Sequence, residues 1–354
     1  MWGKGYHRFT NSPYHHSQAG ICSSSRSANV LSWAVRRCWF AGSLCDPGAL
    51  GPLRLSFTRV GVRFASRDAT IETAMAIRPA AVAGTWYPGT AQALTREVDD
   101  YLSRVETVPS GRVRAVIAPH AGIMFSGPVG AHAYKAAATG DYEVAVLVGP
   151  SHYVAFDGVS VWPDGAFDTP LGAATVDTQG VRALSKFAVV QPLPAAHLRE
   201  HSLEMQLPFL RRLLPDVPIV PLLMGFQQRA TISALGDAIA GAFAGRRVLL
   251  VASTDLSHYF EAQTAERLDA EVEKCVAAFD PEGLWREFEK YPEQERGRYV
   301  ACGGGPAISV MRAARALGAR EARVLKYAHS GEVSGDYSGV VGYLAAVLGE
   351  FDAD

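Results

Sequence analysis

Three residues of the chain have the types and positions from which a metal site could be built. His120 and His152 each follow an apolar, β-branched run, in the segments PHAG (119–122) and GPSH (149–152), and Cys302 lies in a glycine-rich turn before an expected helix. Two imidazoles and a thiolate are good ligands for iron, copper or zinc, and the thiolate disfavours magnesium and calcium. Each residue alone has an ordinary alternative: a hydrogen-bonded structural histidine, or a small buried residue in a tight turn.

A second group has the residue types of acid/base catalysis. Asp255 and His258 follow a third apolar run in the segment STDLSH (253–258), and His201 and Glu204 are three residues apart in an expected helix. We predict His258 as the acid/base group and Asp255 as its orienter. Residues three apart share a helical face, so Glu204 is expected to orient the imidazole of His201. A solvated helix start capped by Ser202 is the alternative for the second pair.

The elements that must position these residues alternate along the chain. Apolar runs predict strands, and amphipathic stretches predict the helices between them. The pattern predicts one α/β domain, with a central, mostly parallel or mixed sheet and helices on both faces. Parallel strands end side by side, so the three polar segments are expected at one sheet edge. The expected strands are 113–118, 144–148, 219–223, 248–252, 324–327 and 340–343, and the expected helices are 91–105, 202–214, 231–244, 262–279 and 306–317.

Composition excludes several classes of protein. The formal net charge of -1 gives no basic face for nucleic acid. The sequence has no apolar run of roughly 18 residues, so we expect no membrane helix. The five cysteines have no CxxC spacing, which argues against a disulfide framework and favours a reducing, cytoplasmic location.

Residues 1–74 differ from the rest of the chain. They are rich in Ser and Arg, their first acidic residue is Asp46, and they show no sustained hydrophobic period. Such a segment is typical of an organelle transit peptide, or it results from a start codon assigned upstream of Met75. In either case we expect an unstructured or mis-annotated extension, followed by a domain at 75–354.

The ordered motifs from Met75 onward resemble the Memo family, also called protein B of the AmmeMemoRadiSam system. They are GTWYPG (84–89), IAPHAG, AHAYK, LVGPSHY, REHSLEMQLPFL, ASTDLSH, the Cys302 turn and SGDYSGVVGYLAAVL. The resemblance implies a fold similar to that of the class III extradiol (LigB-like) dioxygenases, which use non-haem Fe(II). It also implies a metal site at His120, His152 and Cys302, with Asp255, His258, His201 and Glu204 at the positions of further family motifs.

Two departures limit what the resemblance implies. The dioxygenases have a carboxylate where this sequence has Cys302, so ring cleavage does not follow from the fold. Some family members carry a second histidine where this chain has Tyr153.

Two functions stay open from the sequence. The first is a metal-dependent redox enzyme, dioxygenase- or oxidoreductase-like, with iron or copper and a small-molecule substrate. The second is a non-enzymatic protein that sequesters metal or binds a partner in a vestigial cleft, since the resemblance implies adaptors and metal binders among its members. The resemblance also implies radical-SAM and AMMECR-type partner proteins. A zinc hydrolase fits less well, because no nucleophile or oxyanion site is evident.

Overall fold

The computed structural model describes residues 77–352, and the extension predicted at 1–74 lies outside them. The described residues form a mixed nine-stranded sheet with the order β10-β12-β2-β9-β3-β8-β4-β7, in which β11 also pairs with β12. Its strands are β2 (Gly111–Ala118), β3 (Val144–Pro150), β4 (Val159–Val161), β7 (Val190–Pro192), β8 (Ile219–Met224), β9 (Val248–Ser253), β10 (His258–Phe260), β11 (Glu321–His329) and β12 (Val340–Phe351). A small second sheet contains β1 (Ile77–Arg78), β5 (Ala166–Phe167) and β6 (Ala174–Thr175).

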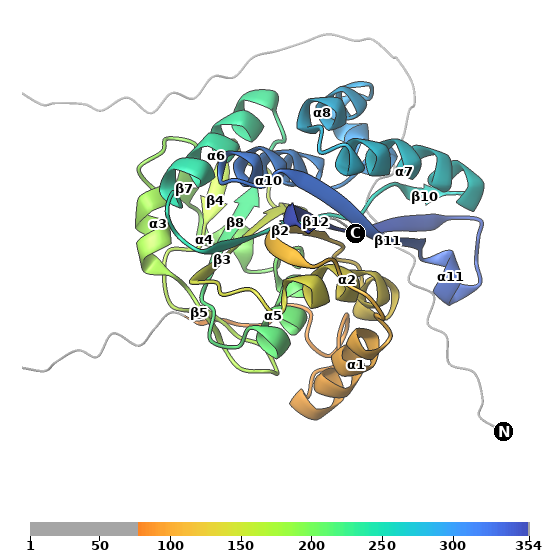
Figure 1. The fold of residues 1–354 in the computed structure, drawn as a ribbon, viewed down its shortest axis with the longest axis horizontal. Helices are drawn as coiled ribbons and strands as arrows, with labels where there is room; N and C mark the ends of the chain where they lie inside the picture. The colour runs from red at the N-terminus through yellow and green to blue at the C-terminus, as the bar shows by residue number, and fades with distance from the viewer. Residues whose placement is uncertain (1–76, 353–354) are drawn as a thin grey trace, which may run out of the picture. The chain divides into compact units, whose positions relative to one another are not determined.

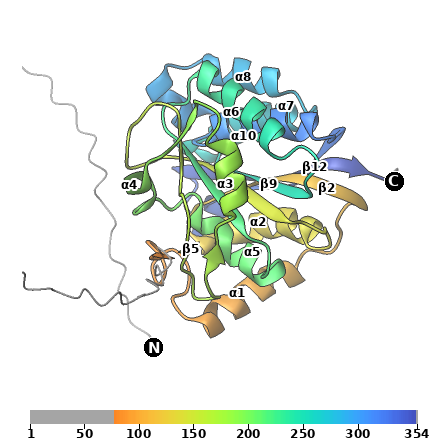
Figure 2. The ribbon, with the colours of Figure 1, turned by 90° about the vertical axis from the view of Figure 1, so that its left-hand side faces the viewer.

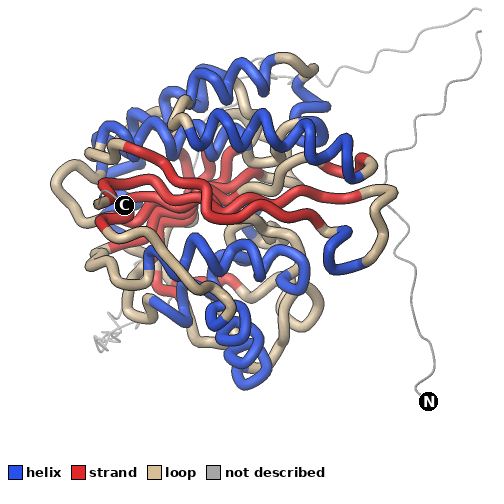
Figure 3. The backbone as a smooth tube through the Cα atoms, turned by 45° about the vertical axis from the view of Figure 1, so that its right-hand side comes forward, coloured by secondary structure: helices blue, strands red, loops and turns tan. Residues whose placement is uncertain are grey.

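Helices cover both faces of the large sheet, as Figures 1 and 3 show. On one side lie α1 (Ala91–Ser103), α2 (Ile123–Ala137) and α5 (Leu207–Leu213), and on the other lie α6 (Arg229–Ala242), α7 (Ala262–Ala277), α8 (Pro281–Glu289) and α10 (Gly304–Ala316). The same two layers enclose the sheet in the perpendicular view of Figure 2. Shorter helices occupy the connections: α3 (Thr178–Leu184), α4 (Pro194–His197), η1 (Glu204–Gln206), η2 (Glu293–Glu295), α9 (Arg296–Tyr299) and α11 (Gly331–Ser334).

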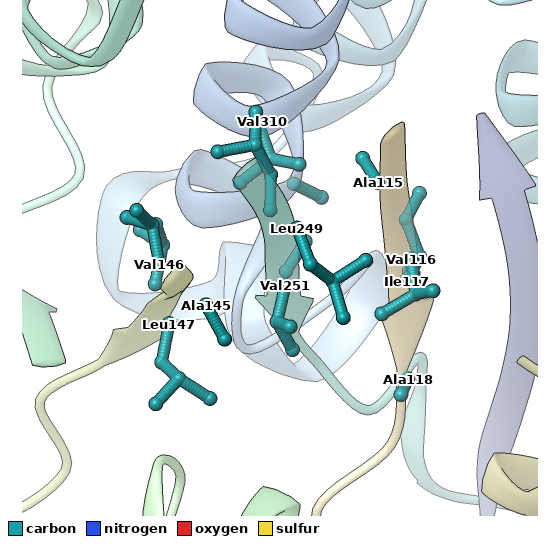
Figure 4. Close-up of a cluster of buried hydrophobic side chains, with 14 of the residues drawn as sticks. Ala115, Val116, Ile117, Ala118, Ala145, Val146, Leu147, Leu249, Val251 and Val310 are labelled. Carbon is teal, nitrogen blue, oxygen red and sulfur yellow. The ribbon is translucent and has the colours of Figure 1, made fainter. Parts of the chain in front are cut away.

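The four central strands β2, β9, β3 and β8 are parallel to one another. All residues of β3, β8 and β9 are buried, because helices cover both faces of a parallel sheet, and this explains their continuous apolar sequences. Figure 4 shows side chains of β2, β3 and β9 packed together with Val310 of α10. The predicted α/β domain with a mixed sheet and helices on both faces is confirmed.

Most predicted elements are present, with shifted ends. All six predicted strands form, and β12 extends eight residues beyond its predicted end at 343, to Phe351. The predicted helix at 202–214 is instead a turn, η1 and then α5. Helix α2 was not expected, since its sequence contains two glycines and Pro128, which lacks an N–H for the helical ladder. Of the described helices, none is long and apolar enough to cross a membrane.

Candidate metal centre

The carboxyl ends of β2, β9 and β3 lie side by side and bring the polar segments together. In the register, Ala118 of β2 faces Ser253 of β9, and Ala252 of β9 faces Val148 of β3. The segments after these strands open into a pocket of about 290 Å³. It is lined by Trp86, His120, Ala121, Gly122, His152, His201, Asp255, His258, Tyr259 and Val341. The prediction that the three strand ends share one sheet edge is confirmed.

Three imidazoles form the centre of this pocket. His120, His152 and His201 each offer a ligand atom within 4.8 Å of the others. The rings of His152 and His201 stack with centroids 4.6 Å apart, and the ring of His120 meets both edge-on. His120 and His201 are buried, whereas the side chain of His152 is 29% exposed. The cluster can therefore hold a metal ion that is reachable from the His152 side.

Cys302 lies against this cluster, immediately before α10. Its Sγ is 3.2 Å from Nε2 of His120, and the backbone N–H of Asp255 donates to the same sulfur at 3.4 Å. Burial by itself raises the pKa of Cys302, but the charge of His120 and hydrogen bonds to His120 and His152 outweigh it and lower the pKa to about 6. A lowered pKa favours the thiolate, which is the form of cysteine that binds metals. The structure brings the three predicted ligands together and adds His201 to them.

Glu200 is the carboxylate that contacts the histidine cluster, and it was not among the residues predicted from the sequence. It accepts hydrogen bonds from the backbone N–H groups of His152, His201 and Ser202, and its Oε1 is 2.9 Å from Nδ1 of His152. Burial lowers the pKa of His152, but hydrogen bonds to Cys302 and Glu200 outweigh it and raise the pKa to about 10. Burial also raises the pKa of Glu200, but His152 and His201 hold it well below its usual range. In the sequence, only the position of Glu200 directly before His201 indicated a role at the site.

Glu204 does not face the histidines, so the expected shared helical face with His201 is wrong. His201 precedes η1 and is not helical. The Glu204 carboxylate is fully buried and ion-paired to Arg78 at 2.5 Å. It also accepts hydrogen bonds from Tyr87 and from the backbone of Ala81 and Val82. These contacts fix the start of the domain against the His201 segment and leave Glu204 without a place in the pocket.

His201 is uncharged in this environment. Burial, with the nearby charges of His120 and His152, lowers its pKa to about 3. Its buried Nδ1 makes no hydrogen bond but lies 3.4 Å from Oε1 of Glu200, and its ring centroid is 4.3 Å from that of Trp86. The ring centroid of Tyr153 lies 5.8 Å from that of His201.

Asp255 and His258 both line the pocket, but they make different contacts. Oδ1 of Asp255 accepts the backbone N–H groups of His120 and Ala121, which fixes the turn after β2. Burial raises the pKa of Asp255 and lowers that of His258. Nδ1 of His258 is buried without a hydrogen-bond partner among the described residues. The acid/base role of His258, with Asp255 as its orienter, stays a prediction.

Comparison with known proteins identifies the family of this chain. A family model described as Memo-like protein matches residues 78–347. The chain is 38% identical to a MEMO1 family protein of Methanopyrus kandleri over 285 residues, which cover 77% of this chain and 98% of the relative. It is 36% identical to a MEMO1 family protein of Methanothermobacter thermautotrophicus, with 75% and 98% covered. An uncharacterised protein of Escherichia coli K12, known from a crystal structure, is 14% identical with a TM-score of 0.47, covering 68% of this chain and all of that one. The chain belongs to the Memo family.

Proposed function

We propose that this protein binds a redox-active iron or copper ion through His120, His152 and Cys302 and uses it to transform a small molecule in the pocket. The observation that carries the proposal is the contact between the Cys302 sulfur and the imidazole cluster at the sheet edge, 3.2 Å from Sγ to Nε2 of His120. Nitrogen and sulfur donors suit iron and copper, and disfavour magnesium and calcium.

The donor set fits such an ion. Three imidazole ligand atoms lie within 4.8 Å of one another, and Nδ1 of His201 lies 3.4 Å from Oε1 of Glu200. The carboxylate of Glu200 faces Nδ1 of His152, which directs Nε2 of that ring toward the centre. A bound ion of this kind supplies redox and Lewis-acid chemistry, which the side chains of the pocket lack.

The surrounding residues determine what the pocket does with a substrate. Trp86 and Val341 give it an apolar wall. His258 lines the same pocket, and burial lowers its pKa, which favours the neutral imidazole. A neutral imidazole is the form that can accept a proton from a bound molecule.

The test is the metal content of anaerobically purified protein, measured by elemental analysis. We expect near-stoichiometric iron or copper in the wild type, and its loss in His120→Ala and Cys302→Ala. Matched controls are His132→Ala on α2 and Cys275→Ala on α7, a free cysteine outside the pocket, which should retain the metal.

Three further outcomes decide between the functions. An absence of metal in the wild type after reconstitution with Fe(II) or copper would refute the metal site and favour a partner-binding cleft. Bound metal with oxygen consumption on catechol-type compounds supports the redox enzyme. Bound metal with no turnover of any compound tested favours metal sequestration.

A further inference from the structure

Ser253, the last residue of β9, lies directly behind His120 with its side chain fully buried. Its Oγ has three partners: Nδ1 of His120 at 2.8 Å, Nε2 of Gln206 at 2.8 Å, and the carbonyl oxygen of Ser202 at 2.6 Å. A hydroxyl offers one hydrogen and two lone pairs. Three partners therefore saturate it, and the role of each can be assigned.

The orientation of the Gln206 amide follows from a backbone carbonyl. Nε2 of Gln206 is 3.0 Å from the carbonyl oxygen of Pro119, which can only accept, so this end of the amide must be the NH₂ group. The other hydrogen of that group points to Oγ of Ser253. On the opposite side, Oε1 of Gln206 accepts the hydroxyl of Tyr134 at 2.8 Å. All these side chains are buried, so water does not replace any partner.

The carbonyl of Ser202 fixes the hydrogen of Ser253 in the same way. It can only accept, so the hydroxyl hydrogen of Ser253 is donated to it. Oγ of Ser253 then has one lone pair for Gln206 and one for His120, and no hydrogen left to donate. Nδ1 of His120 must therefore carry the hydrogen of this contact.

We infer that Ser253, held by Gln206 and Ser202, is a positioning residue that keeps neutral His120 in its Nδ1–H tautomer. The lone pair of the imidazole is then on Nε2, the atom that lies 3.2 Å from Sγ of Cys302. A metal ligand needs its lone pair at that position. The consequence for metal binding rests on the proposed function, whereas the tautomer itself does not.

The tautomer can be measured in the metal-free, full-length protein with ¹⁵N-labelled histidine. Long-range ¹H–¹⁵N correlation spectra distinguish a protonated ring nitrogen from one with a lone pair. They are recorded as a pH series, in which the uncharged form of a histidine shows a single protonated ring nitrogen, and His120→Asn identifies the signals of His120. We expect the hydrogen on Nδ1 in the wild type. A wild-type His120 protonated on Nε2 would overturn the inference, whether or not any Ser253 variant folds.

The variant that tests the role of Ser253 is Ser253→Ala. It leaves Nδ1–H of His120 without an acceptor, so the ratio of the Nδ1–H to the Nε2–H tautomer should fall by roughly tenfold or more. The matched control is Ser309→Ala on α10, which also removes a fully buried hydroxyl, one that donates to the carbonyl of Ile232. It should leave the tautomer unchanged. An unchanged ratio in Ser253→Ala would also overturn the inference.

Titration with Co(II), a coloured probe metal, separates this inference from the proposed function. Ser253→Ala should weaken Co(II) binding by about 10–100-fold, as expected for loss of a residue that orients a ligand, and Ser309→Ala should not. Equal Co(II) affinity in the wild type and Ser253→Ala would refute the positioning role. A wild type that binds neither Co(II) nor Fe(II) but shows the Nδ1–H tautomer refutes the proposed metal function alone.

Discussion

Glu200 contacts His152 twice. Its Oε2 accepts the backbone N–H of His152 at 2.6 Å, and its Oε1 lies 2.9 Å from Nδ1 of the same residue. The Oε1 atom also accepts the backbone N–H groups of His201 and Ser202. One carboxylate therefore joins the end of β3 to the segment that carries the third imidazole and holds both parts of the cluster in place.

We predict that Glu200→Gln weakens metal binding by about 10–100-fold, the usual effect of losing a carboxylate that orients a histidine ligand. An amide has one acceptor oxygen, so its NH₂ group would face a donor of His152 and turn the ring. Anaerobic titration with Fe(II) measures the affinity.

The control for this change is Glu282→Gln on α8, a surface glutamate paired with Arg229 and Arg312. It should bind Fe(II) as the wild type does. Equal affinities in all three proteins would contradict the role assigned to Glu200.

Glu204→Gln should lower the free energy of unfolding by about 3–5 kcal/mol, because it leaves Arg78 buried without its counter-charge. Both side chains of this pair are fully buried. Asp99→Asn is the comparison, since its pair with Arg212 is roughly half exposed, and it should cost about 0–1 kcal/mol. Urea denaturation measures both. If Glu204→Gln lowers the free energy of unfolding no more than Asp99→Asn does, the Arg78–Glu204 pair does not stabilise the fold as proposed.

The stability of the protein should fall as the pH drops below about 6.5, partly because of His197. This residue is buried, and burial with the charge of Arg78 lowers its pKa from 6.5 to about 3. Between these two values the unfolded chain binds a proton at His197 that the folded chain does not, so acid favours unfolding. The contribution is complete above pH 6.5 and disappears as the pH approaches 3.

His197→Gln removes this titration. Between pH 6 and 4, the slope of unfolding free energy against pH should become shallower by up to about 1.4 kcal/mol per pH unit. His132→Gln on α2 is only a partial control, since the pKa of His132 is also lowered by burial, and it should change the slope less. The same slope in wild type and His197→Gln would contradict the prediction.

Gly303→Ala should displace the Cys302 turn. A Cβ at Gly303 would lie 2.3 Å from the carbonyl oxygen of Ser253 and 2.8 Å from Cβ of Thr254, so the turn would have to move away from β9. We expect a loss of about 1–3 kcal/mol in the free energy of unfolding, as for other overpacked sites, together with weaker Fe(II) binding. Gly339→Ala is the control, because nothing lies near its Cβ position. A Gly303→Ala protein as stable as Gly339→Ala would refute this account.

The sequence by itself predicted the strands and the residues at their ends. Runs such as 144–148 and 248–252 are continuously apolar and β-branched, and this local property identifies strands that are covered on both faces. The polar residues that follow must then lie at one sheet edge, so the neighbourhood of His120, His152 and Asp255 could be expected. Helix α2 could not be expected, because Pro128 and the neighbouring glycines locally disfavour a helix. Packing against the sheet overrides that preference.

Only the tertiary structure decided which carboxylate faces the histidines. Glu200 directly precedes His201 and Glu204 follows it by three residues, and helical spacing favoured Glu204. The partner that removes Glu204 from the site is Arg78, 126 residues earlier in the chain, and no local pattern indicates such a contact. The roles of Ser253 and Gln206 could not be predicted from the sequence either. They follow from two backbone carbonyls that can only accept hydrogen bonds. Residue types and periods are local, whereas the direction of a buried side chain is set by distant groups that satisfy its hydrogen bonds and charge.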